Sequence, residues 1–203
     1  MGQIYKNVRK KSWPCMYCGC NDSAINSHLL MRNGILNYVV ENGHLYELRS
    51  DAPEAFKKEE LPISFKKVGI NQSISFPLFC NGHDTSVFIE IENEDVDYTL
   101  YKHMLLYSYR ALLAEIRKKE IEVEKNRRII HSSTLYGILG GVTIDNFSRS
   151  YDLELQGIKD LEYYKEEILN DLQSSTESFV FLSREIPLRG IYASTISSIF
   201  SSI

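Results

Sequence analysis

The sequence predicts an α+β fold, in which a module of short elements is followed by two long helices. Three observations support this. Short segments alternate apolar with polar residues in the first 92 residues, a run at 94–131 has apolar residues at helical spacing, and a second such run covers 151–173. We therefore expect two parts, a mixed module at residues 1–92 and a helical domain at 93–203 that ends in strand-like segments.

The module begins with short elements. The spacing predicts a short helix within residues 29–40, a turn at Asn42-Gly43, and strands at 45–48, 63–65 and 74–76. Residues 51–61 are highly charged, which is typical of a surface loop or a helical turn. Residues 84–92 alternate apolar with polar side chains and fit either a strand or a helix.

The helical part follows. Residues 94–131 are apolar on nearly every face in the first half and mostly charged in the second, so we expect the first half to be buried and the second to face solvent. The glycines at 137–141 lack the lysine of a phosphate-binding loop and predict a turn. The helix at 151–173 should pack antiparallel against the first. Residues 179–182 and 191–203 read as strands, and such an apolar end needs a partner in this chain, in another subunit or in a longer domain.

Two pairs of metal-ligand residues have the same spacing. Two residues separate Cys15 from Cys18, and two separate Cys80 from His83. Such pairs present ligands from tight turns, and two pairs complete a tetrahedral zinc site. Gly19 suits this pattern because it can adopt a left-handed backbone conformation. The alternative is a set of unrelated core cysteines. Cys20 could replace His83 or Cys80 as a ligand, but its spacing from Cys18 is tight, and we expect it to be a free thiol.

Charge and hydropathy limit the partners. The net charge of -4 argues against coating of nucleic acid by bulk electrostatics, although Lys6, Arg9, Lys10 and Lys11 form a basic segment that is either a local binding patch or a solvated tail. No apolar stretch is long enough to span a bilayer and no secretory signal is present. We therefore expect a cytoplasmic protein without membrane contact and without disulfides.

The residues CMYCG, then Ser27-His28, then FCNGHD resemble the treble-clef zinc fold of HNH-type endonucleases over roughly residues 13–92. The resemblance implies a structural zinc ion at Cys15, Cys18, Cys80 and His83. It places His28 at the family's general-base position, where an imidazole takes a proton from water that attacks a phosphodiester. Asp84 falls where the family has its last catalytic ligand, and a carboxylate there suits Mg²⁺ or Mn²⁺.

The sequence departs from the family at two positions. Ser75, Phe76 and Pro77 stand where an asparagine is expected, and Ser27 precedes the histidine in place of an acidic residue. Ligation of zinc by His28, or capping of a helix, therefore stays open beside catalysis. Two hypotheses follow. The first is a variant metal-dependent nuclease acting on nucleic acid. The second is a non-catalytic, zinc-stabilised module whose helices bind a protein partner or a second copy of the chain.

Overall fold

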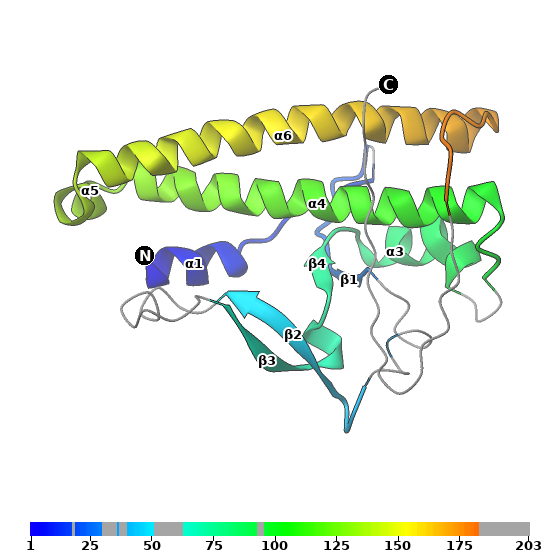
Figure 1. Ribbon diagram of the computed structural model, residues 1–203, viewed down its shortest axis with the longest axis horizontal. Helices are drawn as coiled ribbons and strands as arrows, with labels where there is room; N and C mark the ends of the chain where they lie inside the picture. Colours follow the sequence, from blue (N-terminus) through cyan, green and yellow to red (C-terminus); the bar gives the residue numbers. More distant parts are fainter. Residues whose placement is uncertain (18, 30–35, 37–39, 51–62, 93–95, 183–203) are drawn as a thin grey trace. The chain divides into compact units, whose positions relative to one another are not determined.

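The computed structural model describes residues 1–182 except 18, 30–35, 37–39, 51–62 and 93–95. The chain has an α+β fold, as predicted, and its described part contains long helices and two small sheets (Figure 1). The described residues form two compact units: one contains residues 1–27 and 76–182, and the other contains residues 28–75. The first unit therefore combines the two ligand-bearing segments with the long helices.

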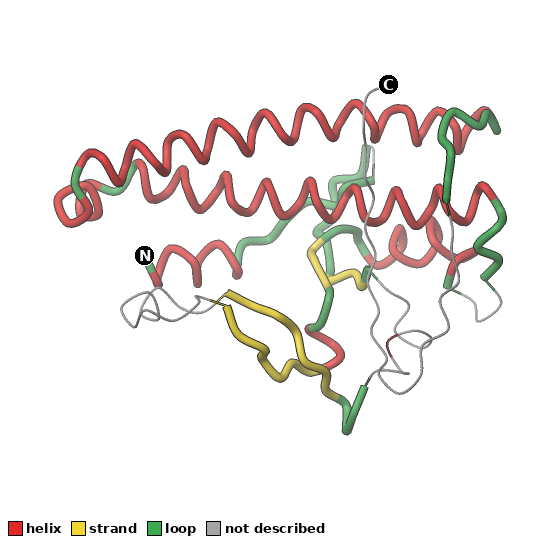
Figure 2. Tube along the Cα trace, viewed as in Figure 1, coloured by secondary structure: helices red, strands yellow, loops and turns green. Residues whose placement is uncertain are grey.

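The long helices form an antiparallel hairpin, as expected. Helix α4 (Tyr101–Ile130) leads through the short α5 (Ser133–Leu139) into α6 (Gly141–Ser174) (Figure 2). Lys119 contacts Glu154 and Asn126 contacts Ser150, so residue numbers rise along α4 as they fall along the adjacent α6. The predicted start of the second helix at 151 was wrong by ten residues, because Ile144 and Phe147 already continue its apolar spacing.

The first half of α4 is buried, as predicted: Leu105, Leu112 and Leu113 are each 1% exposed or less. The expectation that the second half faces solvent was wrong. Arg117, Glu124 and Asn126 are buried, since helix α1 (Gly2–Arg9) packs beside this half of α4 and α6 covers another side. The sequence pattern missed this because the charged residues there pair with one another instead of with water.

Residues 81–91 are helical, which settles the alternative left open for 84–92. Helix α3 (Asn81–Phe88) continues into the 3-10 turn η4 (Ile89–Ile91). Phe88 is fully buried and packs edge-on against Phe79 with ring centroids 5.1 Å apart. The guanidinium of Arg110 lies 4.2 Å from the centroid of the Phe88 ring and forms an ion pair with Glu92, so a cation is built into this core.

The second unit is built on a β-hairpin. Strand β2 (His44–Ser50) pairs antiparallel with β3 (Ile63–Gly69), with Leu45 opposite Val68 on the buried face. The predicted turn before β2 is confirmed, because Asn42 and Gly43 have positive φ angles of 52° and 74°. Leu36 and Leu45 form a small core with Val40, Ile70 and Ile74, and the 3-10 turn η3 (Ile70–Gln72) follows β3.

A two-stranded sheet joins β1 (Asn26–His28) to β4 (Ser75–Pro77), and the division between the two units falls within both strands. The described residues 179–182 have no regular secondary structure, so the strand expected there is wrong. Most of the helix predicted at 29–40, the charged segment 51–61 and the strand-like segment 191–203 lie outside the described residues.

Candidate metal centre

The first ligand-bearing segment is a tight loop in the first unit. A bridge between Pro14 and Ser23 closes it, and the Cys15 N–H donates to the carbonyl of Asp22 at 2.8 Å. Gly19 has φ of +76°, as predicted, and this left-handed conformation turns the chain just before Cys20. The loop therefore directs the side chains of Cys15 and Cys20 to one side.

The second ligand-bearing segment is the start of α3. Cys80 is the N-cap residue of this helix, and its carbonyl accepts a hydrogen bond from the Asp84 N–H at 2.9 Å. His83 lies in the first turn. Backbone hydrogen bonds from Met16 to Leu78 (2.8 Å) and from Ile25 to Phe79 (2.7 Å) hold this segment against the first loop.

Together the two segments form a group of three thiols and one imidazole. The ligand atoms of Cys15, Cys20, Cys80 and His83 lie within 4.8 Å of one another. The Cys20 and Cys80 sulfurs are 3.9 Å apart, and His83 Nδ1 lies 3.5 Å from Cys15 Sγ and 3.1 Å from Cys80 Sγ. Tetrahedral zinc with its usual bond lengths requires sulfur–sulfur and sulfur–nitrogen separations of about 3.8 and 3.6 Å. The donor set and spacing thus suit a metal ion such as zinc.

The thiols of this group differ in acidity. A hydrogen bond from the backbone of His83 lowers the pKa of Cys80, more than burial raises it. At Cys20 a backbone hydrogen bond from Asp22 acts in the same direction, but burial and the thiols of Cys15 and Cys80 together raise its pKa to about 11. The thiolate of Cys80 therefore forms more readily than that of Cys20, and Cys80 lies at a helix N-terminus, which stabilises negative charge.

Two further side chains support the ligands. The Tyr17 ring stacks on the His83 imidazole with centroids 4.1 Å apart and planes inclined by 17°. Arg117 of α4 is buried, donates from Nη2 to the Pro14 carbonyl at 2.7 Å, and lies with its guanidinium 4.9 Å from the Trp13 ring centroid. Burial lowers the pKa of Arg117, and the charges of Glu120 and Cys15 act against that effect. The Arg117 cation is therefore placed to attract negative charge on Cys15.

Three of the four predicted zinc ligands, Cys15, Cys80 and His83, are brought together. Cys18 lies outside the described residues. Cys20, which sequence reasoning set aside as a free thiol, contributes the fourth ligand atom of the group. The signal for Cys20 was the preceding Gly19: a left-handed residue reverses the chain tightly enough for a cysteine on its C-terminal side to face the cluster.

His28 and Asp84, the predicted catalytic pair, belong to different units. His28 ends β1, is half-buried, and places Nε2 3.0 Å from the Ile70 carbonyl oxygen, within the second unit. Asp84 lies in the first turn of α3, half-buried, directly after His83. His28 is not part of the three-cysteine, one-histidine group.

No family model, curated protein or solved structure is recognisably similar to this chain. Among the described residues, no helix combines the length and the apolar character needed to cross a membrane.

Proposed function

We propose that the chain is a non-catalytic, zinc-stabilised interaction protein in which the metal fastens the loop at Cys15 to the start of α3 and so fixes a platform for the helical hairpin. The observation that carries this proposal is the complete set of four donors. Structural zinc sites have four protein ligands, whereas catalytic sites leave one position for water or substrate. Three thiols and an imidazole fill the coordination shell with protein atoms.

The first test is the metal content of purified protein, measured by elemental analysis. We expect one zinc ion per chain, and removal by a strong chelator should unfold the first unit, since structural zinc contributes roughly 10 to 16 kcal/mol of apparent binding free energy in small modules. Thermal melting before and after chelation measures the loss. Metal-free protein with an unchanged melting temperature would contradict the proposal.

A pair of matched variants identifies the fourth ligand. Cys20→Ser should lose zinc, because it removes one of the four clustered donors. Cys18→Ser tests the ligand predicted from spacing alone. If Cys18→Ser loses the metal and Cys20→Ser keeps it, the ligand set is Cys15, Cys18, Cys80 and His83, and Cys20 is not a ligand.

The second candidate function is a variant HNH-like nuclease with His28 as general base. One observation favours it: His28 stands outside the cysteine-rich group, and its bond to Ile70 engages only one ring nitrogen, which leaves the other for proton transfer. Asp84 would then bind Mg²⁺ or Mn²⁺. This proposal requires the two units to bring His28 and Asp84 together.

Cleavage of DNA and RNA with added Mg²⁺ or Mn²⁺ tests the nuclease proposal. His28→Ala should abolish cleavage and leave zinc content unchanged. His28→Gln is the matched control, because its amide can still donate to the Ile70 carbonyl but cannot act as a base at neutral pH. Wild-type protein that shows no metal-dependent cleavage would leave the interaction protein as the function.

A further inference from the structure

The basic segment at the N-terminus becomes part of a larger positive surface in the folded first unit. Residues 1–21 contain four lysines and arginines and no acidic residue, in a chain with net charge -4. Helix α1 carries Lys6 and Arg9, with Lys10 and Lys11 directly after it, and packs beside α4, where the ammonium of Lys125 lies 5.4 Å from the Tyr5 ring centroid. We define the basic face as the seven cationic side chains Lys6, Arg9, Lys10, Lys11, Lys125, Arg127 and Arg128.

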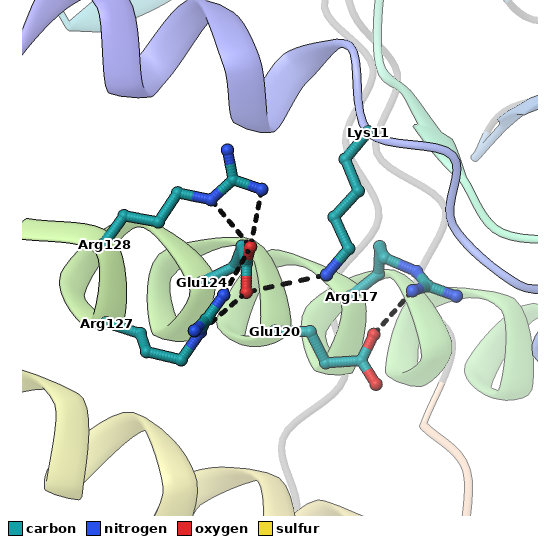
Figure 3. Close-up of polar contacts among 6 residues, drawn as sticks. All are labelled: Lys11, Arg117, Glu120, Glu124, Arg127 and Arg128. Carbon is teal, nitrogen blue, oxygen red and sulfur yellow. Dashed lines mark hydrogen bonds and ion pairs between the residues drawn. The ribbon is translucent and has the colours of Figure 1, made fainter. Parts of the chain in front are cut away.

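The acidic residues of α4 neutralise only part of this face. Glu124 is shared by three cations, since Arg127 and Arg128 donate to it and Lys11 lies 3.6 Å from it (Figure 3). Hydrogen bonds from Arg127, above all, lower the pKa of Glu124 to about 2, so it stays ionised at neutral pH. The basic face with Glu120, Glu122 and Glu124 keeps four net positive charges.

Three cations in or next to α1 form no ion pair with the residues that the structure describes. Lys6, Arg9 and Lys10 are exposed, and none of the ion pairs among the described residues includes them. Their neighbours on the helix surface are polar: Gln3 and Asn7 are exposed and hydrogen-bonded to each other at 2.9 Å. The outer side of α1 thus offers cations and amides, which are the groups that contact phosphate oxygens and sugars in nucleic-acid interfaces.

The apolar side of α1 faces inward. Val8 is fully buried, Ile4 and Tyr5 are half-buried, and the Tyr5 ring contacts Lys125 of α4. A helix that binds in the plane of a membrane needs an outward apolar side to insert between lipids. Since α4 already covers that side of α1, an anionic bilayer would be attracted to α1 only by surface electrostatics. The phosphate backbone of a nucleic acid, by contrast, can bind to exposed cationic side chains alone.

We infer that the basic face binds the phosphate backbone of a nucleic acid, without reading its sequence. This inference rests on the proposed role of the chain as an interaction protein and names the class of partner. Lys6, Arg9 and Lys10 supply the primary contacts, and Arg127 and Arg128 extend the surface along α4. Each neutralised phosphate releases condensed counterions, so affinity must fall with salt in proportion to the number of contacts.

The experiment measures binding of the full zinc-loaded chain to a short fluorescein-labelled DNA duplex, and to the matching RNA, by anisotropy over a series of salt concentrations. Three phosphate contacts predict a slope of log affinity against log salt of about -2.7 on duplex DNA. Each single change Lys6→Ala, Arg9→Ala or Lys10→Ala should reduce that slope by about 0.9. The triple variant should lose the salt-dependent binding.

A matched triple variant controls for net charge. Lys67→Ala, Lys118→Ala and Lys159→Ala remove three exposed cations outside the basic face, so both triple variants have the same net charge. Binding that falls equally in the two variants would overturn the inference, as would wild-type protein that binds neither nucleic acid at low salt, or that binds only vesicles of phosphatidylglycerol. Zinc content is measured in every variant, so failure of the zinc proposal is detected separately.

Discussion

Asp171, near the end of α6, connects that helix to the segment that follows it. The carboxylate accepts hydrogen bonds from the Tyr101 hydroxyl of α4, from Thr176, and from both the backbone and the hydroxyl of Ser178. Burial raises the pKa of Asp171, but these hydrogen bonds outweigh it and bring the value to about 2. One carboxylate therefore joins the two ends of the helical hairpin.

Asp171→Asn should lower the free energy of unfolding by about 2 kcal/mol, because the amide accepts fewer of these hydrogen bonds and cannot supply the charge. The pH dependence follows from the lowered pKa: the stabilisation is present above the unfolded value near 3.8 and is lost as pH falls through about 2. Chemical denaturation at neutral and acidic pH measures this. If the variant and the wild type differ as much at pH 2 as at pH 7, the carboxylate charge is not the cause.

Arg117 links the metal centre to α4. Arg117→Met should keep the helix and fill the same space, but it removes the hydrogen bond to Pro14 and the cation whose charge acts on Cys15. We expect weaker zinc retention against a competing chelator, by at least several-fold. Lys118→Met, one residue further on the exposed side of α4, is the control. Equal zinc retention in both variants would show that Arg117 has no effect on the metal.

At the scale of elements, the first half of α4 is the centre of the first unit. Leu105 is 1% exposed, so Leu105→Asp places a charge where no partner can reach it, and we expect insoluble or unfolded protein. Lys159→Asp on exposed α6 is the control and should fold. Circular dichroism and gel filtration distinguish the outcomes. Folded Leu105→Asp protein would mean that this part of α4 is accessible to water.

Periodic apolar patterns predicted the elements that bury one face. The antiparallel helices, the β2 and β3 strands and the Asn42-Gly43 turn follow from local spacing, because each pattern depends on residues near in sequence. The burial of Arg117 and Glu124 could not be predicted in this way. It depends on α1, which lies far earlier in the chain, and a charged sequence gives no sign that its charges pair inside.

The candidate metal centre also shows what local sequence patterns fail to predict. Spacing predicted Cys15, Cys80 and His83, three members of the clustered group, because two intervening residues make a tight turn. It did not identify Cys20, whose contribution depends on the backbone conformation of Gly19 and on the position of Cys80 across the fold. Local rules recognise a pair of ligands, but the tertiary structure decides which thiols meet.

At the scale of the whole molecule, the first unit is assembled from two stretches of sequence with residues 28–75 between them. The ends of those stretches meet: the Phe79 N–H donates to Ser27 Oγ at 3.3 Å, and Ile25 donates to the Phe79 carbonyl at 2.7 Å. Replacing residues 28–75 by a short glycine-containing linker should therefore leave zinc content and helicity of the remaining chain intact. Loss of zinc in this shortened chain would show that the second unit is needed to form the first.

This arrangement makes residues 28–75 an insertion at a point where the host structure closes on itself. Connections whose two ends lie close together are positions at which proteins tolerate the insertion of whole domains. The candidate metal centre lies on the host side of that point, since Cys20 and Cys80 are contributed from before and after the insertion. Evolution could therefore lengthen, replace or delete the inserted module without disturbing this centre or the basic face, and the two parts of this protein are free to diversify at different rates.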